Sequence, residues 1–275
     1  MRPNRTASLL RAQKPAIGAW LQLGSAAAAR VLAAQGLLDW LLVDFEHAPV
    51  DFSTAASICG AVSDVSSGRV TPLARVASGT MSSVKHALDA GAQGVILPMV
   101  HGPDEVREAA RWARFPPDGE RGCGALLAHL GLGVPRPEYL RRANAEVILG
   151  VQIETVEAVE KVDEILAVPG VDLCFIGPND LHLALGAPAK FWSDHPAFLR
   201  AVARIRAAAA ARGIPLGTLC RDAASARARI DEGFTFVGVG SDAHYMLTFC
   251  GEEMGELRGM ADPGSWCDLV RFEDD

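Results

Sequence analysis

One short apolar run reads Val147-Ile148-Leu149-Gly150-Val151-Gln152-Ile153-Glu154 and ends on a carboxylate. A second reads Val171-Asp172-Leu173-Cys174-Phe175-Ile176-Gly177-Pro178-Asn179-Asp180 and also ends on a carboxylate. Between the two runs, Thr155 to Val168 carries apolar residues at helical spacing, and Pro169-Gly170 follows. This order predicts a strand, a helix, a turn and a second strand.

If these two strands are parallel neighbours, Glu154 and Asp180 leave the sheet at the same edge. Two carboxylates with room for water and substrate suit a hard divalent cation such as Mg²⁺ or Mn²⁺. Each residue also has a structural interpretation, Glu154 as a first-turn acid of the next helix and Asp180 as an N-cap. Their occurrence on successive strands favours the metal interpretation over the two capping roles.

The same alternation recurs along the chain. We expect eight strands, at residues 17–23, 40–45, 72–76, 94–100, 147–153, 171–177, 214–219 and 234–240. Helical segments are expected at 26–34, 52–62, 81–90, 103–114, 156–168, 196–212, 223–232 and 242–260. Eight βα units in about 250 residues predict one (β/α)₈ barrel, an α/β TIM-barrel fold, as a single domain over residues 1–275.

A doubly wound open sheet is the alternative fold. It would need a Gly-rich phosphate-binding turn after the first strand, where the chain has Leu23-Gly24-Ser25-Ala26-Ala27 instead. The longest interruption of the barrel pattern is a Gly- and Pro-rich segment at about 115–140. Extra length on that side of a barrel usually builds the site or an oligomer contact.

The composition excludes several classes of partner. The net charge is −7 and no Lys/Arg cluster is present, which argues against nucleic acid and anionic membranes. No apolar run reaches the ~18 to 20 residues of a membrane helix. The six cysteines are scattered without a C-x-x-C pair, so neither a zinc knuckle nor a disulfide framework is indicated. A cytoplasmic location fits best.

The N-terminal segment allows two interpretations. It is basic, and no acidic residue precedes Asp39, as in an organellar transit peptide. The preferred interpretation is a first helix that packs Leu9 and Leu10 against the domain, because the first strand follows almost immediately.

In a barrel, polar residues at the strand C-terminal ends share one mouth. The set expected there is Asp44, Glu46, His47, Arg75, Gln152, Glu154, Asn179, Asp180, Ser241 and Asp242. It combines a cation site, a fixed positive charge and a group that titrates near neutrality. A structural salt bridge from Arg75 to Asp44 or Glu46 is the alternative for the arginine, and a satisfied loop histidine is the alternative for His47. The roles of His129 and His182 stay open.

An ordered set of short motifs resembles one known family. They run from Asp39-Trp40-Leu41-Leu42-Val43-Asp44-Phe45-Glu46-His47-Ala48-Pro49 through Lys85–Gly94, Pro98-Met99-Val100, Phe115-Pro116-Pro117 with Arg121-Gly122, Val151–Thr155, Pro169–Asp172 and Phe175–Leu181 to Phe236–Asp242. The chain is similar to the metal-dependent (class II) pyruvate aldolases, the HpcH/HpaI aldolase/citrate lyase family. These enzymes cleave 4-hydroxy-2-oxo acids and related 2-keto-3-deoxy sugar acids.

The resemblance implies a role for each matched residue. Glu154 and Asp180 would be the metal ligands, for Mg²⁺, Mn²⁺ or Co²⁺, and Arg75 would stabilise the pyruvate enolate. His47 would handle the proton of the 4-hydroxyl group, supported by Asp44 and Asp89. The substrate-binding set would be Gln152, Arg75, Gly177, Pro178 and Asn179.

The resemblance also implies an assembly and a reaction. The expected activity is aldol cleavage to pyruvate and an aldehyde, and its reverse, through a metal-bound pyruvate enolate. The expected assembly is a homohexamer or homotrimer in which the last helix packs on a neighbour. The chain departs from the family at residues 123–129, and at Asn179 and His182, where Ala and Ser are expected. These departures concern the aldehyde half of the site.

Three other functions remain as alternatives. Oxaloacetate decarboxylation would use the same site, since loss of CO₂ also leaves a pyruvate enolate. A CoA-thioester lyase would need basic residues near the rim for the CoA phosphates, and no cluster is seen. A non-catalytic barrel scaffold would not explain why Arg75, Glu154 and Asp180 occur together. A Schiff-base aldolase is disfavoured because the few lysines fall on predicted helices or loops.

Overall fold

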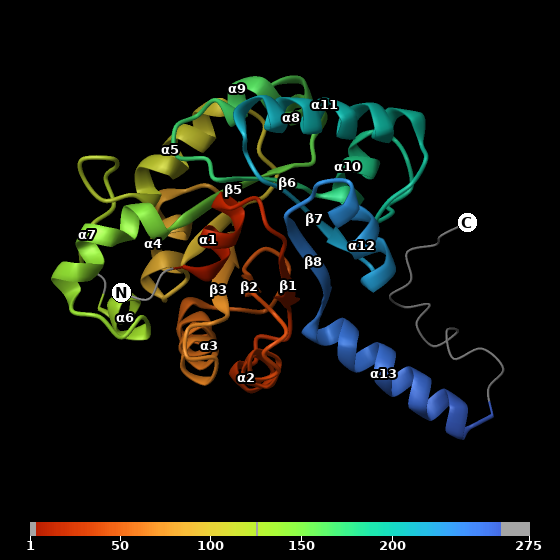
Figure 1. Ribbon diagram of the computed structural model, residues 1–275, viewed down its shortest axis with the longest axis horizontal. Helices are drawn as coiled ribbons and strands as arrows, with labels where there is room; N and C mark the ends of the chain where they lie inside the picture. Colours follow the sequence, from red (N-terminus) through yellow and green to blue (C-terminus); the bar gives the residue numbers. More distant parts are fainter. Residues whose placement is uncertain (1–3, 125, 260–275) are drawn as a thin grey trace.

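Eight parallel strands form a closed barrel at the centre of the computed structural model, which describes residues 4–124 and 126–259 (Figure 1). Each strand pairs with the next in chain order, and β8 returns to β1. The strands are β1 (Ala16–Leu21), β2 (Trp40–Asp44), β3 (Thr71–Arg75), β4 (Gly94–Leu97), β5 (Ile148–Ile153), β6 (Leu173–Ile176), β7 (Leu216–Cys220) and β8 (Phe236–Ser241). The predicted (β/α)₈ barrel is therefore confirmed, and the doubly wound open sheet is wrong.

Helices precede, connect and follow the strands. They are α1 (Arg5–Arg11), α2 (Ala26–Ala34), α3 (Phe52–Val65), α4 (Met81–Asp89), α5 (Pro103–Ala113), α6 (Leu127–Gly131), α7 (Arg136–Glu146), α8 (Val156–Glu160), α9 (Val162–Leu166), α10 (Pro178–Ala184), α11 (Pro196–Arg212), α12 (Ala223–Asp231) and α13 (Asp242–Leu257). Within the described ranges, none of these helices combines the length and apolarity needed to cross a bilayer.

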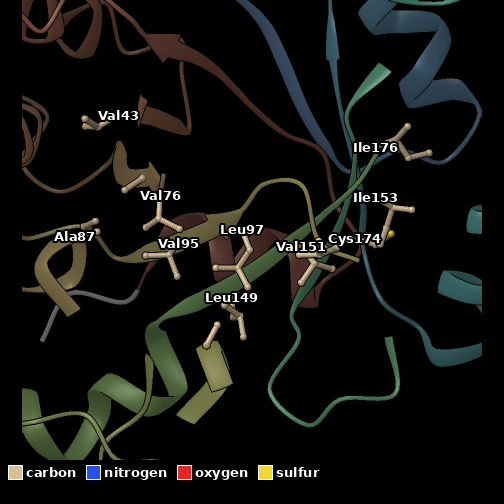
Figure 2. Close-up of a cluster of buried hydrophobic side chains, with 14 of the residues drawn as sticks. Val43, Val76, Ala87, Val95, Leu97, Leu149, Val151, Ile153, Cys174 and Ile176 are labelled. Atoms are coloured by element: carbon tan, nitrogen blue, oxygen red, sulfur yellow. The ribbon is translucent and has the colours of Figure 1, made fainter. Parts of the chain in front are cut away.

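Both faces of the barrel sheet are buried, which explains why its strands are almost continuously apolar. Side chains alternate between the two faces: in β2, Leu41 and Val43 pack toward the helices, while Trp40 and Leu42 fill the barrel interior. Figure 2 shows part of the outer layer, where side chains of the strands meet the surrounding helices. Inside, the rings of Trp40 and Phe236 stack with centroids 4.2 Å apart.

The N-terminal helix closes the end of the barrel where the strands begin. Asn4 caps α1 and is fully buried; its side-chain amide donates to the carbonyl oxygens of Gln93 (3.0 Å) and Glu146 (2.8 Å). Leu10 is buried, and Leu9 packs against the interior cluster. The expected first helix is thus present, and it joins residues that precede β4 and β5.

Some local expectations differ from the structure. The single helix expected at 156–168 is two short helices, α8 and α9, which meet at Lys161. The segment at about 115–140 holds the helix α6 and the start of α7, which continues to Glu146. The run that ends at Asp180 leaves the sheet at Ile176 and continues as the short helix α10. Met260, the expected end of the last helix, lies outside the described residues.

Candidate active site

The polar residues expected at one mouth do lie where the parallel strands end. Asp44 and Arg75 are the last residues of β2 and β3, and Glu154 directly follows β5. Asn179 and Asp180 lie in the first turn of α10, after β6. Since all eight strands run in one direction, these side chains share the C-terminal rim, the usual place of TIM-barrel active sites.

Arg75 is held in a single orientation by its neighbours. Its Nε and Nη2 donate to the two oxygens of Asp44 at 2.9 and 2.8 Å, and Nη1 lies 2.9 Å from Glu46 Oε2. The guanidinium carbon lies 4.3 Å from the ring centroid of Trp20, in β1. The salt bridge considered from the sequence is therefore real. It fixes a positive charge at the rim and does not conflict with a catalytic role.

Trp20 was not singled out from the sequence. Its indole forms the surface beneath Arg75 and is itself buried, with Nε1 lacking a hydrogen-bond partner among the described atoms. The only sequence signal was its place near the end of the first predicted strand.

Asp44 and Glu46 differ in their electrostatic state although both face Arg75. Burial pushes the pKa of Asp44 upward, but hydrogen bonding and charge from Arg75 outweigh it and hold this pKa below its usual value. For Glu46, burial dominates and raises the pKa, although the positive charge of Arg75 opposes it. Asp44 is therefore the principal counter-ion of Arg75.

Glu154 is a carboxylate almost completely shielded from water, with 1% of its surface exposed. Its Oε1 accepts the main-chain N–H of Met99 at 2.7 Å, and Oε2 accepts Nε2 of Gln152 at 2.8 Å. Met99 adopts φ = 48°, a left-handed conformation uncommon for a residue with a side chain. Burial, and then the negative charges of Asp180 and Glu46, raise the pKa of Glu154 to about 7. Glu154 precedes the N-cap of α8, Thr155, so it is not a first-turn acid.

Asp180 is brought to Glu154 by a close approach of two chain segments. A Cβ on Gly177 would lie 1.7 Å from Glu154 Oε2, so only glycine fits there. Gly177 is the N-cap of α10, with Pro178 as its first residue, and Asp180 follows within the first turn. The N-cap role considered for Asp180 therefore belongs to Gly177.

The donor set at this rim fits a divalent cation. Four carboxylates (Asp44, Glu46, Glu154 and Asp180) act on one another electrostatically, whereas Arg75 is the fixed positive charge that acts on them. Burial leaves the pKa of Glu154 raised although Arg75 lowers it, and a cation bound beside Glu154 would favour its ionised form. Over residues 4–124 and 126–259, no group of three or more His, Cys, Asp or Glu forms a ready-made metal cage. Two protein carboxylates would thus leave positions for water and substrate.

Two amide oxygens at the rim are also without partners. Gln152 Oε1 and Asn179 Oδ1 are buried and accept no hydrogen bond from the described atoms. Gln152 is 2% exposed and turns its amide nitrogen to Glu154. A buried acceptor without a donor has a free-energy cost, which a bound ligand, water or ion would remove.

His47 lies at the outer edge of this group. Its side chain is 60% exposed, and Nε2 is 3.7 Å from Glu46 Oε2. Its main-chain N–H donates to Asp44 Oδ1 at 3.3 Å. The histidine is thus tied to the Asp44–Arg75 pair through its backbone and has a ring accessible to substrate.

Asp89 is not at the C-terminal end of a strand, unlike the residues above. It is the last residue of α4, a helix that returns toward the N-terminal ends of the strands, and its Oδ1 accepts Nη2 of Arg121 at 3.0 Å. Asp242 has a structural role, because it is buried and accepts the main-chain N–H groups of Gln22 (2.7 Å) and Leu23 (3.3 Å). Ser241 caps α13.

The two histidines left open by the sequence are both buried. His129, in α6, bonds through Nδ1 to the carbonyl oxygen of Val134 (3.0 Å). His182, in α10, bonds through Nδ1 to Pro178 O and through Nε2 to Ser193 Oγ, both at 2.7 Å. The partner of His182 on a later loop could not be read from the sequence.

Comparisons with known proteins agree with this architecture. The family model described as HpcH/HpaI aldolase/citrate lyase matches residues 16–248. A hydroxypyruvate/pyruvate aldolase of Paraburkholderia phytofirmans is 38% identical over 259 residues, 93% of this chain and 98% of that protein. A 4-hydroxy-2-oxo-heptane-1,7-dioate aldolase of Escherichia coli is 38% identical over 243 residues, covering 87% of this chain and 89% of that protein.

Among solved structures, one from Burkholderia cenocepacia J2315 is described as an HpcH/HpaI aldolase/citrate lyase family protein. It shares 37% sequence identity with this chain and superposes with a TM-score of 0.84. The match covers 93% of this chain and 99% of that one.

Proposed function

Because the chain belongs to the HpcH/HpaI aldolase/citrate lyase family and is a carbon–carbon lyase, we propose that it cleaves a 4-hydroxy-2-oxo acid to pyruvate and an aldehyde. The reverse aldol addition would use the same site. The observation that carries the proposal is the buried carboxyl group of Glu154, whose pKa is raised and which lies beside Asp180 on the same rim as the fixed charge of Arg75.

Glu154 and Asp180 would hold a divalent cation, Mg²⁺, Mn²⁺ or Co²⁺. When bound, the cation supplies a Lewis acid that stabilises the negative charge developing as pyruvate becomes an enolate. The two carboxylates suit this ion because hard cations prefer oxygen ligands and tolerate water in the remaining positions. The contacts of Glu154 support this role: among the described residues it accepts hydrogen bonds from Met99 and Gln152 and touches no positively charged side chain.

Arg75 would stabilise the enolate oxygen. Its Nε–H and one Nη2–H face Asp44, and one Nη1–H faces Glu46, which leaves one N–H on each terminal nitrogen for a substrate oxygen. Preorganised charge of this kind is typically worth ~3 to 4 kcal/mol in the transition state. Asp44 would orient the guanidinium, and Gln152 and Asn179, with the backbone at Gly177 and Pro178, would line the pyruvate pocket.

His47 would remove the proton of the 4-hydroxyl group as the C3–C4 bond breaks and return it in the reverse direction. Its exposed ring suits a group that meets the aldehyde part of the substrate. The supporting role that the resemblance gives to Asp89 stays a prediction, since in this chain its carboxylate pairs with Arg121.

The test is a pyruvate-release assay against a panel of 4-hydroxy-2-oxo acids that differ in the aldehyde part. We expect turnover of at least one member, loss of activity in excess chelator, and recovery on adding Mg²⁺, Mn²⁺ or Co²⁺. Glu154→Gln and Asp180→Asn should lose both activity and the ion. Full turnover in chelator would contradict the cation role.

Oxaloacetate decarboxylation is the second candidate, favoured by the same rim because it also ends at a pyruvate enolate. His47→Ala separates the two reactions, since decarboxylation has no hydroxyl proton to remove. We expect the aldol rate to fall by at least ~10²-fold and the decarboxylation rate by distinctly less. Equal losses in both reactions would remove the proton-transfer role from His47.

A further inference from the structure

His182 and Asp180 project from opposite sides of one short helix. Two residues along an α-helix differ in direction by about 200°. Asp180 acts electrostatically on Glu154 and Glu46 at the rim, whereas His182 is 1% exposed and lies against α11. The helix α10 has only seven residues, and a helix of this length does not hold its position without tertiary contacts.

The hydrogen bonds of the His182 ring connect the start of α10 with the loop that contains Ser193. Pro178 O can only accept, so Nδ1 carries the proton that it receives at 2.7 Å. In the neutral ring Nε2 is then an acceptor, and the Ser193 hydroxyl donates to it at 2.7 Å. Ser193 Oγ in turn accepts the main-chain N–H of His195 at 3.2 Å. The main chain of Lys190 is a further hydrogen-bond partner of the ring, so both ring nitrogens are held by α10 or by the loop before α11.

Aromatic packing fixes the plane of the same ring. His182 stacks on Phe198 of α11, with centroids 3.9 Å apart and planes 19° from parallel. Trp192 meets Phe198 edge-on, with centroids 5.1 Å apart. The imidazole thus joins α10 to the segment that contains Ser193 and to the first turn of α11.

We propose that His182 is a positioning residue: through Pro178 and Ser193 it fixes the start of α10 and so the direction of the Asp180 carboxylate. The proposal rests on the cation role of Asp180 proposed above. His182 itself does not reach the reacting atoms. Because His182 keeps α10 ordered before the ion binds, binding at Asp180 does not carry the entropy cost of ordering this helix.

The test measures Mn²⁺ binding to the metal-free protein by electron paramagnetic resonance, without substrate, together with the melting temperature in chelator. His182→Phe keeps a ring on Phe198 and removes both hydrogen bonds. We expect its Kd for Mn²⁺ to rise about threefold to tenfold, the equivalent of one net hydrogen bond. Ser193→Ala keeps the ring and its packing, and should raise Kd by a smaller factor. The double variant should be no worse than His182→Phe, because both changes break one chain of bonds.

Two controls separate the possible outcomes. His129→Phe removes another buried ring-to-carbonyl bond, away from α10, so it should lower the melting temperature and leave Kd unchanged. Asp180→Asn tests the proposed function: if it binds Mn²⁺ like the wild type, the ligand assignment fails, whatever His182 does. If Asp180→Asn loses the ion but His182→Phe and Ser193→Ala both bind it normally, His182 is only structural and the inference is wrong. Should His182→Phe fail to fold, Ser193→Ala alone decides between these results.

Discussion

At the scale of single residues, Arg75 both neutralises a buried carboxylate and presents a fixed positive charge at the rim. Arg75 satisfies the fully buried Asp44 and at the same time is held over Trp20 in a fixed direction. A buried pair broken on one side leaves an uncompensated charge, and this is costly. Residue-scale variants of this site therefore change stability and catalysis together, and the two effects need separate measurements.

Arg75→Lys should lower both the stability of the fold and the catalytic rate, and the effect on the rate should be the larger. Lysine keeps the charge but loses the planar fork that bonds both oxygens of Asp44. We expect kcat to fall by more than ~10²-fold, the usual effect of a lost preorganised donor, and the melting temperature to fall measurably. The check is kcat normalised to the folded fraction from a thermal melt. If the folded fraction is fully active, Arg75 acts only on the fold.

The raised pKa of Glu154 predicts how stability depends on pH without metal. Its pKa is about 7 when folded, against 4.5 for an unperturbed glutamate, so the folded state holds a proton that the unfolded state loses between these values. Stability from this group is therefore present below about pH 4.5 and is lost as pH rises toward 7. A bound cation reverses the trend, because it favours the ionised carboxylate.

Melting temperatures from pH 5 to 8, with chelator and with Mn²⁺, measure this effect. We expect stabilisation by Mn²⁺ to grow as pH rises through 7, and Glu154→Gln to remove most of that growth. Equal stabilisation by Mn²⁺ at pH 5.5 and pH 8 would show that Glu154 titrates outside this range or does not bind the ion.

At the scale of elements, the strands could be predicted but some helices could not. Apolar runs buried on both faces are visible in sequence, and all eight strands lie within the expected segments to within a few residues. The helix α10 was missed because Gly177-Pro178 resembles a turn after a strand. It is held by tertiary contacts such as the hydrogen bond between His182 and Ser193, which are 11 residues apart. Such tertiary contacts leave no local periodicity to read.

In the candidate site, too, some residues could be predicted from the sequence and others could not. Parallel strands placed Asp44, Arg75, Glu154 and Asp180 on one rim without any knowledge of side-chain contacts. Asp89 was named from the resemblance alone, and its place at the end of α4 puts it beside Arg121. Trp20 was not singled out and the role of His182 stayed open, because the importance of both side chains lies in what they touch.

The helix α1 gives an element-scale prediction that separates fold from site. Asn4 ties α1 to Gln93 O and Glu146 O, at the end of the barrel remote from the rim. Asn4→Ala removes these bonds and the helix cap, so we expect a loss of about 2 kcal/mol in unfolding free energy. The kcat of the folded enzyme should not change. Denaturant unfolding and steady-state rates check the two parts, and a fall in kcat would show coupling along the barrel.

At the scale of the whole molecule, α13 is the feature that the barrel does not explain. It extends from β8 beyond the barrel wall (blue in Figure 1), and its start is anchored through Ser241 and Asp242. Its exposed large apolar side chains are Met246, Leu247, Phe249, Met254 and Leu257. These side chains have no covering partner among residues 4–124 and 126–259, and an exposed apolar helix face indicates an interaction surface. We propose, as the resemblance implies, that this helix packs on another copy in a homohexamer or homotrimer.

The last prediction tests that assembly. Leu247 and Phe249 are 51% and 66% exposed, and burying such side chains contributes about 1.5–3 kcal/mol each. Leu247→Glu combined with Phe249→Glu would place two charges in the interface, so the mass from light scattering should fall to that of a smaller species. Leu199→Glu, on an exposed leucine of α11, is the matched control and should keep the wild-type mass. An unchanged mass in the double variant would mean that α13 does not hold the copies together, and the exchange of this helix would have to be abandoned.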